Sequence, residues 1–528
     1  MYDSDIRLAK IEVTARVIDN IYNSLKEDKN SLDVIINENL FYERKRLKEE
    51  RDNKRIIEDK KFWKDVNKRL NVGNEKEFEF ILEEIVKRYV SEITGHFSVP
   101  VYKFATMVLP RALSLMLNPL SIKKFIEEFP NIPSLENNLH ISGEVETFKR
   151  LGENATIILT PTHISNLDSP LIGLVIYMLG FNPFLYGAGL NLFENPVFSY
   201  FMHNLGAYTV DRKKKNSIYK ATLKEYSIFA LERNYHSLFF PGGTRARSGA
   251  VENKLKKGLL GTGIKAYINN LVNNKEKKDI FIFPLNLSYQ LVLEAETLID
   301  DFLKESGQSR YIIDDDESSK LEKMALFTSK LISLDSQIHF RIGKPIDVFG
   351  NYVNEEGVSI DNRGRTINRS DYITENGKIV FDDQRDAVYT QKLANTIEKE
   401  FHRNNIILAN NIVSFATFEM FKMLHPTLDI YKLVRIGNTF RGIPIKKLSE
   451  FIDSIMTKLR NLHNDKKIYL PPEVIDLNTL DIINIALKFG SIYHKYDYLY
   501  RRGDKIYSED LSLLFYYHNK LTGYGLEK

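Results

Sequence analysis

Apolar residues recur at two different spacings along this 528-residue chain, and the change of spacing divides it into regions. Up to about residue 95 the spacing is helical, and the polar positions between are densely charged with both signs. The clearest example is an apolar stripe formed by Phe78, Ile81, Leu82, Ile85 and Tyr89. This pattern predicts a helical N-terminal region over residues 1–95, whose stripe packs on the rest of the protein, on a second subunit or on a membrane.

Short β-rich runs alternate with helical stretches between about 96 and 350. The runs at 155–160, 207–210, 237–240, 280–283 and 339–348 each predict a strand. Between the first two, residues 170–179 predict a helix, with Ser169 as its N-cap and Pro170 at its first position. Strands that alternate with helices indicate an α/β domain with a parallel or mixed sheet flanked by helices.

The remaining chain changes character twice more. Residues 351–382 are polar and rich in turn residues, which predicts a connector or an exposed hairpin. From 383 to 528 helical spacing dominates again, which predicts a helical C-terminal region. The expected organisation is therefore an α/β domain over 96–350 between two helical regions, with a connector at 351–382.

Composition excludes several classes of protein. Hydrophobic residues make up 43% of the chain and charged residues 27%, as in ordinary globular proteins. A formal net charge of +4 is too small over this length to predict nucleic-acid binding. The chain has no cysteine, which excludes disulfides, Cys-ligated zinc and a thioester on the protein itself, and it permits an intracellular location. The 11 histidines show no H-x-H or H-E-x-x-H pairing, so we expect no metal.

Two apolar stretches are candidates for membrane spans. The stretch at 97–122 contains charges and prolines, and the stretch at 169–193 contains several Gly, Asn and Pro residues. The second is better explained by a buried helix and strand joined by a loop. The first ten residues do not form the basic and apolar pattern of a signal peptide. We therefore expect no transmembrane helix.

Residues 160–170, TPTHISNLDSP, carry the first candidate chemistry. His163 and Asp168 stand five positions apart in the loop between a predicted strand and a predicted helix, where a turn can bring the carboxylate to the imidazole. Such a pair suits removal of a proton from a hydroxyl. A packed or surface histidine is the plain alternative. A Ser–His hydrolase that uses Ser165 is another, although no G-x-S-x-G motif surrounds it.

Two later segments are basic and also follow predicted strands. Arg212 comes directly after the strand at 207–210, and its planar guanidinium suits a phosphate. The next three residues, Lys213 to Lys215, are expected to be largely a solvated loop. Residues 241–249, PGGTRARSG, combine close backbone approach at the glycines with two arginines. A plain glycine turn is the alternative to the phosphate pocket that we expect at Gly243, Thr244, Arg245 and Arg247.

The order of these segments resembles the glycerolipid acyltransferases. That family has H-x4-D, then Gly-x5-Arg, then F-P-x-G-T-R, then a strand that ends near proline, and this chain has the same order between about 155 and 290. Residues 187–193, 246–249 and 510–519 are more similar to glycerol-3-phosphate acyltransferases than to the shorter lysophosphatidate enzymes. One departure stands out, because the family usually carries Glu where this chain has Gly242.

The resemblance implies an enzyme that transfers a fatty acyl group from a thioester to the sn-1 hydroxyl of glycerol 3-phosphate, the first step of phospholipid synthesis. It implies His163 as general base and Asp168 as its orienting partner. The implied phosphate site consists of Arg212, Gly243, Thr244, Arg245 and Arg247. Acyl-CoA or acyl carrier protein would be the co-substrate, with no further cofactor. The implied location is cytoplasmic and peripheral, on the inner face of the cell membrane. Acylation of 1-acyl-glycerol 3-phosphate and a non-catalytic module that binds anionic lipid are the alternatives.

Overall fold

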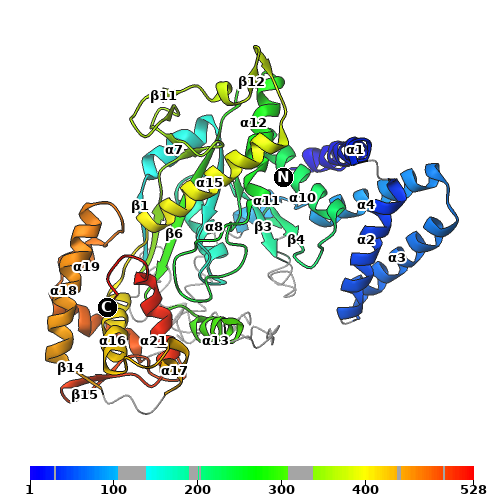
Figure 1. Cartoon of the computed structure of the whole chain (residues 1–528). Helices are drawn as coiled ribbons and strands as arrows, with labels where there is room; N and C mark the ends of the chain where they lie inside the picture. Colours follow the sequence, from blue (N-terminus) through cyan, green and yellow to red (C-terminus); the bar gives the residue numbers. More distant parts are fainter. Residues whose placement is uncertain are drawn as a thin grey trace.

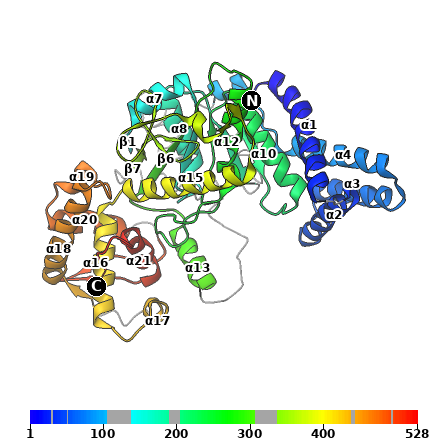
Figure 2. The same cartoon turned by 45° about the horizontal axis from the view of Figure 1, so that its top comes forward.

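The computed structural model describes residues 1–28, 31–50, 52–104, 138–189, 200, 204–306, 337–436, 442–491 and 494–527. Within these residues the chain is helical at both ends and has a large mixed sheet between them (Figure 1). The N-terminal helices and the C-terminal helices lie on opposite sides of the sheet in both views (Figures 1 and 2). The predicted α/β class, with helical regions before and after the sheet, is confirmed.

In the described residues the main sheet has eleven strands. They are β1 (Leu139–Gly143), β2 (Thr156–Pro161), β3 (Leu185–Gly189), β4 (Ala207–Val210), β5 (Ser237–Leu238), β6 (Ile280–Tyr289), β7 (Ile338–Ile342), β8 (Ile346–Asp347), β9 (Tyr352–Val353), β10 (Ser359–Ile360) and β11 (Thr366–Ile367). The order is β11-β10-β9-β8-β6-β2-β5-β3-β4, and β7 joins β1 to the far half of β6. Strands β6, β2, β5, β3 and β4 are parallel to their neighbours in this order, whereas β7 and β8 pair with β6 in the antiparallel sense.

The predicted strand positions differ from the structure at two places. The expected strand at 237–240 is shorter in the structure: β5 covers its first two residues, Phe239 still donates to Leu159 of β2, and the chain then turns into the glycine-rich loop. The expected closing strand at 339–348 is divided into β7 and β8 by the irregular residues 343–345. Strands β9 to β11 extend the sheet past residue 350, and β10 and β11 form an antiparallel hairpin, followed by a separate hairpin of β12 (Thr374–Glu375) and β13 (Lys378–Ile379).

Helices cover both faces of the sheet, because alternate residues of the central strand point to opposite sides. Ile157 and Leu159 of β2 belong to one apolar cluster, whereas Ile158 between them belongs to another. The first cluster includes α7 (Val145–Asn154) and α8 (Asp168–Met178). The second includes α10 (Ser217–Glu232), α11 (Lys257–Leu260), α12 (Thr262–Val272) and α15 (Asp383–Arg403).

The N-terminal helices form a bundle that packs against α10. Its members are α1 (Asp3–Asp28), α2 (Leu32–Glu49), α3 (Lys54–Val72) and α4 (Glu75–Ile93). Ile81, Leu82, Ile85 and Tyr89 of the predicted stripe are fully buried, and they share a cluster with Tyr219 of α10. The stripe therefore packs on the rest of the protein, as the first of the three alternatives predicts.

The C-terminal region packs around one buried helix, α16 (Ala409–Leu424), which contacts three other helices. Its elements are α17 (Ile430–Arg435), β14 (Ile443–Pro444), α18 (Ile445–Asn464), α19 (Pro472–Ile475), α20 (Thr479–Gly490), β15 (Tyr500–Arg502), β16 (Lys505–Tyr507), α21 (Leu511–His518) and the 3-10 turn η6 (Asn519–Leu521). Helices α16 and α21 share the apolar cluster of the sheet's β6 and of α13 (Ala295–Ser306). The C-terminal region is thus continuous with the core of the sheet domain.

Across the parts of the chain described above, no helix is both long enough and apolar enough to cross a bilayer. The apolar run at 169–193 begins with α8 and continues into β3, as predicted, and its residues 190–193 lie outside the described residues. Most of the other candidate stretch, residues 105–122, also lies outside them.

Candidate active site

Three loops that carry the predicted residues leave the same edge of the sheet. They follow the carboxyl ends of β2, β4 and β5, which run parallel in one continuous part of the sheet. Ligand sites of α/β sheets form at this edge, because the loops converge where the strands end. His163, Arg212 and Arg245 therefore come together although up to about eighty residues separate them in the sequence.

The loop after β2 forms a closed pair from His163 and Asp168. The imidazole Nδ1 lies 2.9 Å from Oδ2 of the buried Asp168 carboxylate. A carboxylate accepts hydrogen bonds and does not donate them, so Nδ1 carries the proton and Nε2 remains an acceptor. This tautomer is the one that a general base needs.

Helix α8 begins two residues earlier than the sequence predicts, and the predicted cap is wrong. Its first residue is Asp168, and its N-cap is Leu167, which makes no side-chain cap bond. The Asp168 carboxylate accepts from the backbone N–H groups of Ile164 and Ser165 at 2.6 and 3.0 Å. The Ser169 hydroxyl instead lies 2.5 Å from the hydroxyl of Tyr186. The carboxylate thus organises the loop before the helix as well as the histidine.

Burial and nearby cations set the protonation of His163. Its ring stacks on Phe240, with 4.0 Å between centroids, and its side chain is 14% exposed. Burial lowers the pKa of His163 below the ordinary value of 6.5, and Arg245 and Arg212 lower it further, while Asp168 raises it. The lowered pKa keeps the imidazole neutral and able to accept a proton near pH 7.

The loop after β5 (residues 239–256, the glycine-rich loop) directly contacts the loop after β2 (residues 162–167, the histidine loop). The backbone N–H of Ala246 donates to the carbonyl of His163 at 2.7 Å. Gly243 has a φ of +80°, a conformation that only glycine adopts without strain, and Thr244 beside it is exposed. The two segments singled out from the sequence therefore form one site.

The arginines of this loop have acidic partners that the sequence did not reveal. Arg245 Nη1 lies 3.3 Å from Oε1 of Glu294, whose side chain is fully buried. Glu294 also accepts from the Ser165 hydroxyl at 2.8 Å and from the backbone N–H of Asn166 at 2.9 Å. Arg247 pairs with Glu305 on α13. Arg245 is thus held toward the histidine loop, whereas Arg247 is held toward α13.

The same contacts argue against a serine hydrolase. Ser165 is buried, and its hydroxyl donates to Glu294 rather than to the imidazole. A serine nucleophile needs its hydroxyl within hydrogen-bond reach of the base and open to substrate. Ser165 therefore holds the loop in place.

A model of the acyltransferase family matches residues 142–288, which contain all of these loops. The match runs from the end of β1 to the end of β6. This segment is an acyltransferase domain.

Several curated glycerol-3-phosphate acyltransferases are similar to the chain. The enzyme of Pseudomonas aeruginosa (strain PAO1) is 23% identical over 233 residues, which are 44% of this chain and 25% of that protein. The enzyme of Aeromonas hydrophila is 29% identical over 164 residues, 31% of this chain and 20% of that protein. The enzyme of Xanthomonas axonopodis pv. citri is 25% identical over 158 residues, 30% of this chain and 17% of that protein. The matched region thus spans a quarter or less of these relatives, and it confirms the resemblance to this family.

One prediction about the basic loop of the acyltransferase domain is wrong. Lys214 is 4% exposed and lies between the N-terminal bundle and α10, not in a solvated loop. Its Nζ pairs with Glu92 and lies 4.0 Å from Glu43 and 4.6 Å from the Tyr89 ring centroid. The exposed neighbours Lys213 and Lys215 do behave as predicted. The bundle thus holds the loop that presents Arg212, because its carboxylates bind a lysine two residues away.

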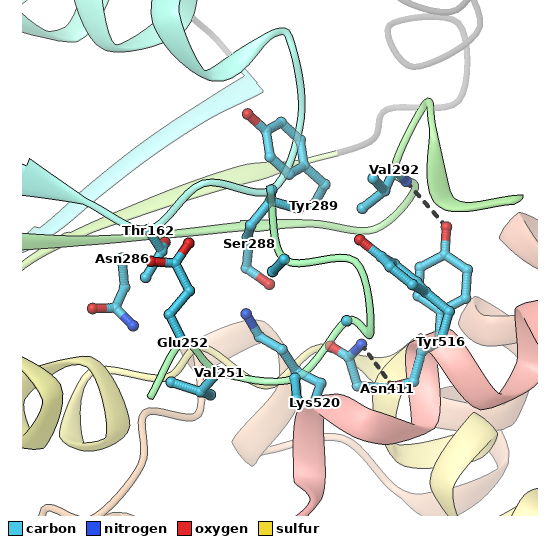
Figure 3. Close-up of a pocket in the computed structure, with 15 residues that line it drawn as sticks. Thr162, Val251, Glu252, Asn286, Ser288, Tyr289, Val292, Asn411, Tyr516 and Lys520 are labelled. Carbon is cyan, nitrogen blue, oxygen red and sulfur yellow. Dashed lines mark hydrogen bonds between the residues drawn. The ribbon is translucent and has the colours of Figure 1, made fainter. Parts of the chain in front are cut away.

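A cavity lies behind the histidine loop of the acyltransferase domain, between the sheet and the C-terminal helices (Figure 3). Glu252 enters it from the glycine-rich loop and Lys520 enters it from η6. Burial raises the pKa of Glu252 to about 8, and the charge of Lys520 opposes that rise. Burial also lowers the pKa of Lys520 to about 8. Neither residue stands in a motif that the sequence would single out, because each is brought here by tertiary packing alone.

Proposed function

We propose that the protein transfers a fatty acyl group from an acyl thioester to the sn-1 hydroxyl of glycerol 3-phosphate. The observation that carries the proposal is the His163–Asp168 pair, with the charges of Arg212 and Arg245 acting on the same imidazole. A neutral base beside two cations suits an acceptor that carries both a hydroxyl to deprotonate and a phosphate to bind.

The reaction follows from these positions. Nε2 of His163 takes the proton of the acceptor hydroxyl while its oxygen attacks the thioester carbonyl. The tetrahedral intermediate collapses, the carbon–sulfur bond breaks, and the imidazolium returns the proton to the leaving thiolate. Asp168 stabilises the imidazolium between the two steps. Because the chain has no cysteine, the acyl group passes from donor to acceptor without a thioester on the protein.

Arg245 and Arg212 would bind the acceptor phosphate from two sides, with Gly243 and Thr244 allowing its approach and Arg247 contributing charge at the rim. Holding the acceptor beside the base is expected to supply much of the rate, because the thioester is already activated. Acyl-CoA or acyl carrier protein is the proposed donor, with no metal or other cofactor.

The test is acyl transfer by the purified full-length protein. Radiolabelled acyl-CoA and acyl carrier protein are each offered with glycerol 3-phosphate and, separately, with 1-acyl-glycerol 3-phosphate. The proposal expects labelled 1-acyl-glycerol 3-phosphate from the first acceptor. Acylation of the second acceptor alone would identify a lysophospholipid acyltransferase. Binding to anionic vesicles with no transfer in any combination would identify a lipid-binding module.

We also propose peripheral attachment to the cytoplasmic face of the cell membrane, where the acylated product would enter the bilayer. Basic residues near an anionic surface contribute about 1 kcal/mol each, and the exposed Lys213 and Lys215 follow Arg212 in the chain. Release from membranes by high salt or alkaline carbonate is the expected result. Release by detergent alone would contradict it.

A further inference from the structure

The side chain of Glu252 fills the space into which a side chain at position 242 would project. A Cβ added to Gly242 would lie 2.4 Å from Oε2 and 2.7 Å from Cδ of Glu252. Gly242 is not among the glycines with positive φ, so its backbone would accept any residue. A side chain at position 242 would therefore displace the carboxyl group of Glu252.

Glu252 joins the two loops of the site. Its Oε1 accepts the backbone N–H of His163 at 2.7 Å, and the nearby backbone N–H of Gly242 lowers the pKa of this carboxyl group. Oε2 is buried and has no hydrogen-bond partner among the described residues. The carboxyl group of Glu252 thus ties His163 to the glycine-rich loop.

This contact completes a series along the histidine loop. Four consecutive backbone N–H groups, from residue 163 to residue 166, each donate to a carboxyl oxygen. Asp168 accepts the middle two, Glu294 accepts the last, and Glu252 accepts the first, that of His163 itself. Without Glu252, the N–H closest to the imidazole would be left unpaired in a buried site, which favours rearrangement of the loop.

The C-terminal region closes the same cavity. Lys520 reaches toward Glu252 from η6 (Figure 3), and its charge acts on Glu252 and on Asp168. Glu252 is thus enclosed between the sheet domain and the C-terminal helices, where its position is defined by packing on both sides.

We propose that Glu252 is a positioning residue for acyl transfer, because its carboxyl group fixes the backbone of His163. The glycerolipid acyltransferases usually carry a Glu at the position of Gly242, and here Glu252 supplies that carboxyl group from position 252. This inference rests on the proposed function of His163 as the base. A misplacement of about 1 Å in such a group lowers a rate on the order of a hundredfold.

The test is an exchange of the two positions. Glu252→Ala is expected to lower kcat by roughly ten- to hundredfold, because a buried N–H loses its acceptor, with little change in the KM for glycerol 3-phosphate. Gly242→Glu alone is expected to be unstable and inactive, because two carboxyl groups then compete for one space. Gly242→Glu combined with Glu252→Ala is expected to recover most of kcat and to melt above either single variant.

Two further variants complete the comparison. Glu252→Gln is expected to retain more activity than Glu252→Ala, because its amide oxygen accepts the same N–H, and it carries the test if the alanine variant does not fold. Asn253→Ala, at the exposed neighbour, is the matched control and is expected to behave as wild type.

A wild-type kcat in the folded Glu252→Ala protein, or a double variant no more active than Glu252→Ala, would overturn the assignment. The melting temperatures of the wild type, Glu252→Ala, Gly242→Glu and their double variant show, without any assay of activity, whether side chains at 242 and 252 compete for one space. Absence of acyl transfer by the wild-type protein would instead contradict the proposed function. If the melting shifts of the two single variants also added up in the double variant, the two side chains would not share one space, and the proposed role of Glu252 would be contradicted as well.

Discussion

Tyr289 at the end of β6 donates a hydrogen bond to Oδ1 of Asp168 at 2.5 Å, although the two residues are 121 positions apart. Burial and the charge of Asp168 raise the pKa of Tyr289 well above its ordinary value, so its hydroxyl stays protonated and remains a donor. The other oxygen of Asp168 already accepts from the imidazole and from two backbone N–H groups. Both oxygens of this carboxylate are therefore bound, which holds it in line with His163.

Tyr289→Phe tests this relationship. Loss of a hydrogen bond to a buried charge is expected to lower the free energy of unfolding by about 1.5–3 kcal/mol. Activity is expected to fall less than when the base itself is removed, because three donors to Asp168 remain. Urea unfolding of the two proteins measures the change, and an unaltered midpoint and slope would contradict the structural assignment.

His163→Ala and Asp168→Asn test the proposed base. Removal of a positioned general base lowers rates by roughly 10²–10⁴-fold, and we expect a loss of this size in kcat for His163→Ala. Asp168→Asn is expected to be impaired too, because the amide cannot accept from the imidazole and the backbone in the same way. Circular dichroism verifies the fold, and wild-type turnover by a folded His163→Ala protein would eliminate the mechanism.

The pH dependence of kcat/KM reports the pKa of the free base. The base acts when neutral, so activity falls as pH decreases through the pKa of His163, which burial lowers below 6.5. Arg245 lowers this pKa further, so Arg245→Ala is expected to move the acid limb to higher pH. Arg247→Ala, whose charge pairs with Glu305, is expected to move it less. The acceptor phosphate titrates equally in each profile, so the difference between variants is diagnostic, and a shift to lower pH in Arg245→Ala would be incompatible with this assignment.

Arg245 also tests the phosphate site. Arg245→Ala is expected to raise the KM for glycerol 3-phosphate by roughly ten- to more than a hundredfold, from the loss of a charge-assisted bond. Arg245→Lys should recover only part, because an ammonium lacks the two-pronged geometry. Lys215→Ala, at an exposed position of the basic loop, is the matched control. Equal increases in the two alanine variants, or an effect on the acyl donor alone, would show that Arg245 does not bind the acceptor phosphate.

Lys214 tests how the N-terminal bundle supports the site. Lys214→Met removes one partner from a buried ionic cluster, and such a loss lowers the free energy of unfolding by about 3–5 kcal/mol. We expect a rise in acceptor KM as well, because Arg212 stands two residues away. Lys213→Ala breaks an exposed pair with Glu50 and is expected to cost less than about 1 kcal/mol. Equal unfolding midpoints for the two variants would show that burial of Lys214 contributes nothing.

The sequence by itself determined the class of the fold and pointed to the first members of the candidate site. Helical and strand spacing depend on which face of each element is buried, and His163, Asp168, Arg212 and Arg245 follow strands within recognisable segments. It misplaced the start of α8, because Asp168 begins the helix and its carboxylate binds the preceding loop, while the Ser169 hydroxyl contacts Tyr186 and caps nothing.

Only the tertiary structure decided which carboxyl groups support the site and what surrounds Lys214. Glu252 binds the backbone of His163 from 89 positions away, and Glu294 binds that of Asn166 from 128 positions away. Their meeting depends on the order of parallel strands and on the packing of the C-terminal helices, and neither leaves a local pattern in the chain. Lys214 looks like its solvated neighbours in the sequence, and it becomes a buried ion because the N-terminal bundle folds over it with carboxylates to match.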